Sequence, residues 1–171
     1  MKQPLEEHAA RFDEKAPEYD SEKPDEYKAA VSLVIDHARP QSDDVVLDLG
    51  TGTGAIALAL AEDAKEVVGR DISEGMLEKA REKATDRGLE NVSFGPGRFR
   101  EPDAPETVDI VTSNYAMHHL DDEQKREAIA LIGELEPRRF VLGDIMFLEG
   151  LNPELYATDV DDPATIGVLV D

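Results

Sequence analysis

An apolar run that carries an acid and leads into a turn of alternating glycines constrains this chain most. Residues Val45–Leu49 include Asp48 and lead into the turn Gly50–Gly54, and an apolar helical run, 55–61, follows at once. A second apolar run then ends in another acid, Asp71. Strand, glycine turn, helix, strand and carboxylate in this order are typical of a nucleoside-binding βαβ unit.

Each part of this turn has a physical use at a ligand site. Glycine lets the backbone turn sharply and lets a ligand approach where a Cβ would otherwise stand. The helix that begins there directs free N–H groups and the positive end of its dipole toward the ligand. Asp71 follows the second strand, where its carboxylate can accept hydrogen bonds from both hydroxyls of a ribose.

The length and composition set the broad class. A chain of 171 residues is long enough for one domain with its own core. No apolar run approaches membrane-spanning length, and residues 1–7 lack the apolar core of a signal peptide, so we expect a cytoplasmic protein. The absence of cysteine excludes thiol catalysis, disulfides and cysteine-ligated metals. With four histidines in the chain, no metal site is expected.

The net charge of −21, from 39 acids against 18 bases, is the other strong feature. The acids are spread along the whole chain, which favours a halophile, since concentrated salt screens self-repulsion. A local acidic patch for a basic partner is the alternative. The acidity also disfavours nucleic acid as a partner, although a uniformly acidic proteome weakens that argument.

Strand and helix signals alternate along the chain. The predicted strands are 44–49, 66–70, 91–95, 108–112 and 139–143, and the predicted helices are 24–40, 54–63, 73–88 and 121–135. Residues 5–23 are expected to form a short helix and a loop, and Asp162-Pro163 to begin a last helix. This alternation predicts an α/β, Rossmann-like, doubly wound parallel sheet with helices on both faces.

Several segments resemble the motifs of one family. Residues 48–54 resemble the first motif of the class I S-adenosylmethionine-dependent methyltransferases, and residues 68–77 are similar to the second. Residues 108–120 resemble the strand-four segment of the branch that acts on small molecules, and residues 135–137 also fit. The resemblance covers about residues 10–150. It implies a sheet of order 3-2-1-4-5, S-adenosylmethionine as the cofactor and a small-molecule acceptor.

The resemblance also assigns residues to the cofactor. The three glycines shape the turn under the methionine and ribose parts, Asp71 binds the ribose diol, and Ile72 packs on the adenine. Asp48 lies near the turn, Asn114 lines the methionine end through its backbone, and Tyr19 closes over the cofactor. The full implied set is Tyr19, Asp48, Gly50, Thr51, Gly52, Gly54, Asp71, Ile72, Met76, Arg98, Phe99, Asn114 and Tyr115.

His118 and His119 are the candidates for catalysis. Adjacent side chains point in different directions, so the two are not expected to chelate a metal. We expect one to pack or to cap the helix at Asp121. The other is expected to face the crevice beyond the strand ends, where it would serve as a general base for a hydroxyl acceptor.

Some residues depart from the family pattern. Arg98 stands where the family commonly has an acid that reads the adenine amino group, so adenine recognition is assigned to the backbone around Phe99. Arg70 replaces an apolar residue, and Pro137-Arg138-Arg139 lacks the usual Pro-Gly-Gly turn. The segment after Asp144 is expected to be too short for the helix and antiparallel strand pair that close the family's sheet. Strand five is therefore expected to be an exposed edge. Either two copies pair through it as a homodimer, or this is a shortened enzyme that binds its cofactor poorly.

One methyltransferase domain is therefore expected, with a helical cap (1–40), a cofactor-binding core (41–148) and a tail (149–171). Three functions stay open: methyl transfer to a small molecule, a non-catalytic module that binds S-adenosylmethionine or a partner, and an NAD(P)-dependent dehydrogenase. Gly52–Ala57 satisfies the dehydrogenase pattern G-x-G-x-x-A. Asp48 argues against that third function, because its carboxylate would face a pyrophosphate but suits an ammonium and a sulfonium.

Overall fold

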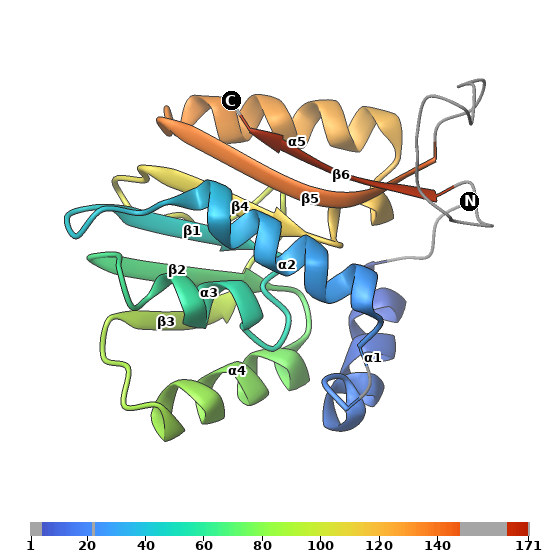
Figure 1. The fold of residues 1–171 in the computed structure, drawn as a ribbon. Helices are drawn as coiled ribbons and strands as arrows, with labels where there is room; N and C mark the ends of the chain where they lie inside the picture. The colour runs from blue at the N-terminus through green and yellow to red at the C-terminus, as the bar shows by residue number, and fades with distance from the viewer. Residues whose placement is uncertain (1–4, 22, 148–163, 171) are drawn as a thin grey trace.

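In the part of the chain that the structure describes, six strands form one sheet in the order β3-β2-β1-β4-β5-β6 (Figure 1). The computed structural model describes residues 5–21, 23–147 and 164–170. The strands are β1 Val45–Leu49, β2 Glu66–Asp71, β3 Val92–Pro96, β4 Ile110–Asn114, β5 Arg139–Phe147 and β6 Ala164–Val170. The helices are α1 Leu5–Lys15, α2 Asp25–Ala38, α3 Ala55–Leu60, α4 Glu74–Asp86 and α5 Asp122–Glu134, with 3-10 turns η1 Ala16–Glu18 and η2 Met117–His119.

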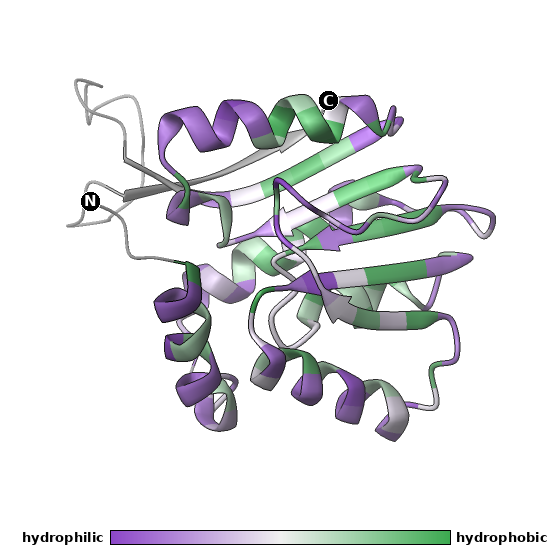
Figure 2. Cartoon of the chain, turned by 180° about the vertical axis from the view of Figure 1, so that it is seen from behind, coloured by the Kyte–Doolittle hydropathy of each residue, from purple (hydrophilic) through white to green (hydrophobic). Residues whose placement is uncertain are grey.

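The central strand β1 is buried on both faces, which explains why it reads as an almost continuous apolar run (Figure 2). All five residues of β1 are buried. Because successive side chains point to opposite faces, Val46 joins an apolar cluster with residues of α2 and α3, while Leu47 joins a second cluster with residues of α5. The helices therefore cover both faces of the sheet, as the alternation predicts.

The first five strands are parallel in the order 3-2-1-4-5, so the prediction of a Rossmann-like sheet is confirmed. The predicted N-terminal caps of two helices are also confirmed. Ser73 accepts a hydrogen bond from the Met76 amide at the start of α4, and Asp121 and Gln124 form a capping box at α5. Within the described ranges, no helix has both the length and the hydropathy that a membrane crossing needs.

The expectation that strand five is the exposed edge is wrong. β6 pairs with β5 in antiparallel fashion from Val141↔Val170 to Phe147↔Ala164. This pairing extends β5 past Asp144, where the strand was expected to end. One antiparallel strand of the family's closing pair is thus present, and the homodimer through an open β5 edge loses its basis.

The predicted start of a last helix falls on residues 162 and 163, which lie outside the described residues. The segment directly after them is β6, a strand. The β-branched residues of Ala164–Val170, one threonine, one isoleucine and two valines, suit a strand better than a helix. The prediction rested on Asp162-Pro163 as a helix start, although β-branched residues follow it.

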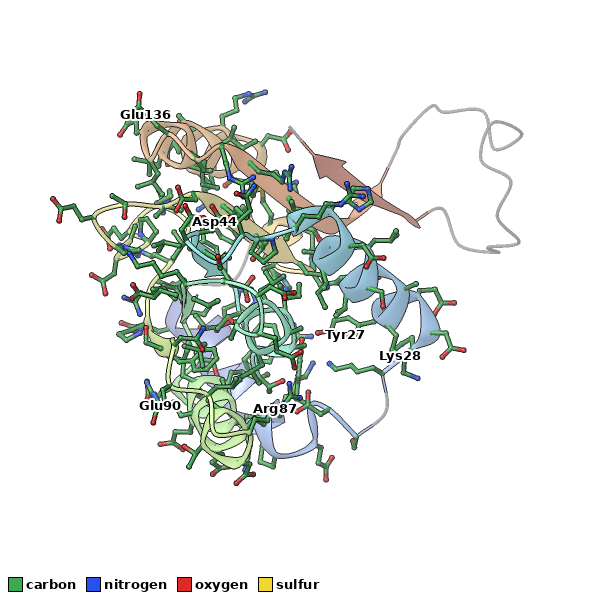
Figure 3. All side chains as sticks on the ribbon, turned by 60° about the vertical axis from the view of Figure 1, so that its left-hand side comes forward. Tyr27, Lys28, Asp44, Arg87, Glu90 and Glu136 are labelled. Carbon is green, nitrogen blue, oxygen red and sulfur yellow. The ribbon has the colours of Figure 1, made fainter. Side chains whose placement is uncertain are left out.

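Two arginines at the start of β5, Arg138 and Arg139, replace the expected glycines for a structural reason. Arg138 pairs with the buried carboxylate of Asp44, which directly precedes β1. The Arg139 guanidinium donates to the carbonyl oxygens of His37 (3.1 Å) and Ala38 (2.8 Å), the last residues of α2. Asp44 is labelled in Figure 3, at the amino end of the sheet. Both arginines therefore tie β5 to neighbouring elements at the end of the sheet away from the strands' carboxyl ends.

Candidate functional site

A cavity of about 660 Å³ lies beyond the carboxyl ends of β1, β2 and β4, and residues of α1 contribute to its lining. Figure 1 shows α1 beside these strand ends. Its lining comes from the cap (α1, η1 and the first turn of α2), the glycine turn, the segments that follow β2 and β3, and residues 114–124 after β4. The strand order reverses between β1 and β4. Open α/β sheets bind ligands at such a switch point.

The glycine turn is fixed by its own backbone. Gly50, Gly52 and Gly54 all have positive φ, at 71°, 54° and 83°. A Cβ on Gly50 would lie 2.4 Å from the Cβ of Ala116, so this position also needs glycine for space. The Gly50 amide donates to the carbonyl oxygen of Arg70 at 2.9 Å, which joins the turn to the end of β2.

Asp71 projects into the cavity and is held by backbone amides. Its Oδ2 accepts from the Gly52 amide at 2.8 Å, and its Oδ1 accepts from the Ser73 amide at 3.0 Å. Burial raises the pKa of Asp71, although both amides favour its charged form. Each oxygen keeps a further lone pair, so the carboxylate can accept two more hydrogen bonds from a ligand.

Asp48 is a second cavity carboxylate and is 2% exposed. Its Oδ1 accepts from the Thr112 hydroxyl at 2.7 Å. Burial raises the pKa of Asp48 to about 6, and the charge of Asp71 adds to this effect. A cationic group bound beside Asp48 would stabilise its charged form.

The carboxyl end of β4 places an unpartnered amide at the cavity. Both polar side-chain atoms of Asn114 are buried, and neither has a hydrogen-bond partner among the described residues. A Cβ on Gly143 would lie 2.3 Å from Asn114 Oδ1, so the glycine makes room for this side chain. Tyr115 follows with φ of 53°, a strained value for a bulky residue and one that is frequent at functional sites.

The two histidines have different surroundings. The Asp144 carboxylate accepts from the His118 amide at 2.8 Å and lies 2.5 Å from its Nδ1, so His118 anchors η2 to β5. His119 lines the cavity, as expected of one of the pair. Burial lowers the pKa of His119 to about 4, so its ring is neutral at neutral pH. The helix α5 is capped by Asp121 and not by a histidine.

Side chains of the N-terminal cap, residues 5–40, contact residues of the site. The His119 ring lies 4.3 Å from His8 and 5.7 Å from Phe12, both on α1. Asp20 accepts from the Thr53 hydroxyl at 2.7 Å and pairs with Lys83 at 2.5 Å, so the segment after η1 is tied to the glycine turn. These contacts hold an aromatic wall over the cavity.

A family of methyltransferase domains matches residues 46–135 of this chain. The chain belongs to this family. An uncharacterized methyltransferase of a Geobacillus species is 36% identical over 146 residues, which are 84% of this chain and 66% of that protein. The crystal structure of the YcgJ protein from Bacillus subtilis has 33% identity and a TM-score of 0.65, covering 75% of this chain and 54% of that one.

The methyltransferase domain spans less than two thirds of the length of these relatives. A further solved structure, that of the [4+2]-cyclase SpnF, has a TM-score of 0.74 at 18% identity and covers 87% of this chain and 63% of that one. At that identity the likeness shows the fold alone. It also illustrates that this fold carries more than one chemistry.

The domain brings most of the predicted site residues to one cavity. Those that line it are Tyr19, Asp48, Gly50, Thr51, Gly52, Asp71, Ile72, Met76, Arg98, Phe99, Asn114, Tyr115 and His119. Gly54 begins α3 instead, and His118 faces Asp144. The guanidinium of Arg98 donates to the Glu101 carboxylate at 2.9 Å from Nε, so an ion pair forms at the position where the family has an acid.

Sequence reasoning missed the cap residues that line the cavity. His8 and Phe12 of α1 and Tyr27 of α2 belong to the lining. Their one signal was the helical spacing of aromatic residues in an otherwise charged N-terminal segment, which indicates an amphipathic helix but not what it covers.

Proposed function

We propose that this domain transfers a methyl group from S-adenosylmethionine to a small molecule. The observation that carries the proposal is Asp71, a carboxylate at the end of β2 whose two oxygens accept hydrogen bonds from the amides of Gly52 and Ser73. The glycine turn beside it lies within the residues that match the methyltransferase family. Relatives named as methyltransferases support the reaction class.

The residues of the cavity suit the parts of this cofactor. Asp71 has free acceptor capacity for the ribose diol, and Ile72 and Phe99 offer apolar surface to the adenine. Asp48 offers negative charge to the ammonium and the sulfonium. Asn114 supplies a buried amide without a partner in the described chain, which a polar group at the methionine end would satisfy. Solved neighbours titled as complexes with the same cofactor share this fold.

The protein's contribution to such a reaction is alignment. The sulfonium methyl of this cofactor is already activated when bound, so the acceptor must be held in line with it and water excluded. Orientation of this kind can supply about 7–11 kcal/mol of the barrier. The glycine turn would position the cofactor, and α1, which lines part of the cavity, would exclude water.

We infer that His119 acts as a neutral group facing the acceptor. With a pKa of about 4 it carries no charge at neutral pH and can accept a hydrogen bond or a proton from a hydroxyl. The same low pKa makes it a weak base, which favours an acceptor that needs little deprotonation. His118 is assigned to anchoring η2 through Asp144.

Titration calorimetry with S-adenosylhomocysteine tests the proposal, comparing the wild type with Asp71→Ala in molar potassium chloride. We expect micromolar binding by the wild type and loss of about tenfold or more in the variant, since a charge-assisted hydrogen bond is lost. NADH is the competitor that tests the dehydrogenase alternative. Equal binding of S-adenosylhomocysteine by both proteins, or its displacement by NADH, would contradict the proposal.

A further inference from the structure

Aromatic side chains are concentrated at the cavity. Only 5% of the chain is phenylalanine, tyrosine or tryptophan, yet three of its four tyrosines and two of its four histidines belong to the cavity lining. Six rings of this lining come from the cap and from the segment after β4, and we name them the aromatic belt. The belt consists of His8, Phe12, Tyr19, Tyr27, Tyr115 and His119.

The rings of the belt contact one another across the cap and the strand ends. Phe12 on α1 lies 5.7 Å from His119, and Tyr27 on α2 lies 5.2 Å from Tyr115, both between ring centroids. His118 joins the two pairs, since its ring lies 4.0 Å from that of His119 and 6.4 Å from that of Tyr115. Edge-to-face contacts of this kind are favourable, so the rings hold one another in place before a ligand binds.

The belt is not part of the core. Two apolar clusters flank the sheet, and among their described members there is no residue of the belt. All six belt residues are partly exposed. Rings that line a cavity and stay partly exposed offer apolar surface to a ligand instead of to the core.

The belt borders the residues assigned to the reacting end of the cofactor. Tyr115 directly follows Asn114 at the end of β4. A Cβ on Gly52 would lie 4.0 Å from the Tyr19 ring, so the belt also meets the glycine turn. An acceptor must approach the cofactor at its sulfonium. The belt is therefore the part of the lining that an acceptor would contact.

The charges around the belt disfavour a charged acceptor. The Lys23 ammonium lies 3.0 Å from the centroid of the Tyr19 ring and 4.8 Å from that of Tyr27, so a second cation at these rings would meet a like charge. An anion would meet the carboxylates of Asp48 and Asp71, and the two arginines of the lining are paired with glutamates.

We propose that the aromatic belt binds the acceptor and that this acceptor is an uncharged, planar aromatic molecule, an inference that deepens the proposed function and rests on it. An aromatic molecule gains ring–ring contacts that a saturated molecule of similar size does not make. His119 adds an uncharged ring nitrogen, which can hydrogen-bond to a polar substituent.

The first test compares two molecules that differ in aromaticity. 2-Naphthol and decahydro-2-naphthol share a carbon skeleton and a hydroxyl, and the second is saturated. Calorimetry is run in molar potassium chloride on the protein saturated with S-adenosylhomocysteine. We expect 2-naphthol to bind about tenfold or more tightly than decahydro-2-naphthol, because several ring contacts add up.

The second test changes the charge and keeps the ring. 2-Naphthoate is an anion and 2-naphthylmethylammonium is a cation. We expect each to bind about tenfold or more weakly than 2-naphthol, because the first meets the carboxylates of the cavity and the second meets Lys23.

The third test removes one ring of the belt. Phe12→Leu keeps an apolar side chain and should weaken 2-naphthol about three- to tenfold, while decahydro-2-naphthol stays within about twofold. Phe12→Tyr keeps the ring and should retain the affinity for 2-naphthol. Phe140→Leu is the matched control, since Phe140 packs on the cluster beside α5 and is not in the cavity lining, and it should change neither ligand.

Four results would overturn the assignment of the belt. They are equal affinity of the wild type for 2-naphthol and its saturated counterpart, binding of either charged molecule as tight as that of 2-naphthol, an equal loss of both uncharged molecules in Phe12→Leu, and no binding of 2-naphthol at all. In each case the wild type still binds S-adenosylhomocysteine. Failure of the wild type to bind S-adenosylhomocysteine would instead overturn the proposed function.

Discussion

The two walls of the cavity are built in different ways. On the β1–β2 side, positive-φ glycines and backbone amides fix the turn and the carboxylate of Asp71. On the cap side, rings and ion pairs from distant positions, such as the His8–His119 contact and the Asp20–Lys83 pair, close the site. The first wall is a property of a short continuous segment, whereas the second depends on tertiary packing.

The two walls should therefore differ in how many substitutions they tolerate. Backbone hydrogen bonds and φ restraints allow few substitutions, because a wrong residue strains the chain itself. Side-chain contacts at a partly exposed surface contribute modestly and can be replaced. We therefore expect the glycine-turn wall to carry cofactor binding and the cap to tune access and the acceptor end.

Gly50→Ala should give the largest effect. The new Cβ would meet Ala116 at 2.4 Å and would force φ of 71° on a residue that disfavours it. We expect a loss of about 2–4 kcal/mol in the free energy of unfolding, measured by denaturant in potassium chloride. The control is Gly133→Ala in α5, where no atom lies within 4 Å of the new Cβ and a gain of about 0.5–1 kcal/mol is expected. Equal effects at both positions would contradict the strain argument.

Asp48 should make the affinity for S-adenosylhomocysteine depend on pH. Its pKa of about 6 means that the group is largely neutral at pH 5 and charged at pH 8. Because the ligand ammonium favours the charged carboxylate, binding should strengthen as pH rises through about 6, with a loss of about tenfold at pH 5. Calorimetry with S-adenosylhomocysteine between pH 5 and 8 measures this slope. Asp48→Asn should bind more weakly and show no such slope; a slope retained in Asp48→Asn would assign it to another group.

Asp20→Asn probes the tie between the cap and the glycine turn. Burial alone would raise the pKa of Asp20, but hydrogen bonds from Lys83 and Thr53 lower it below its ordinary value. The tie is partly exposed, so its loss should cost only about 1 kcal/mol at pH 7. A lowered pKa means that this stability is fully present above the ordinary pKa of 3.8 and is lost as pH falls through the lower pKa of the folded state, so wild type and variant should converge well below pH 4. Thermal melts at pH 7 and at about pH 2 check this, and a difference that grows at low pH would contradict it.

The glycine-turn wall could be predicted from sequence because its information is local. One continuous segment contains a strand, the glycines of Gly50–Gly54, a helix and Asp71. Their order predicts both the turn and the carboxylate that its amides bind. The cap could not be predicted, since no pattern indicates that His8 meets His119. The β5 edge was predicted wrongly because antiparallel pairing with β6 depends on a partner separated by residues with no periodic signal.

His119→Gln should have the smallest effect of the set. The ring is neutral and contacts other rings at 4.3–5.7 Å, so a polar neutral replacement loses aromatic contact and little else. We expect a stability loss of about 1 kcal/mol or less and a change under about threefold in the affinity for S-adenosylhomocysteine. A loss as large as that of Asp48→Asn would show that the cap side carries cofactor binding after all.

The central claim is that Asp71 grips the two ribose hydroxyls. A cycle of two ligands and two proteins tests it most directly, with S-adenosylhomocysteine, its 2′-deoxy analogue, the wild type and Asp71→Asn in calorimetry. The account predicts that removal of the 2′ hydroxyl weakens binding to the wild type by about tenfold and hardly alters the weak binding to the variant, because both changes remove the same contact. An equal loss in both proteins would contradict it.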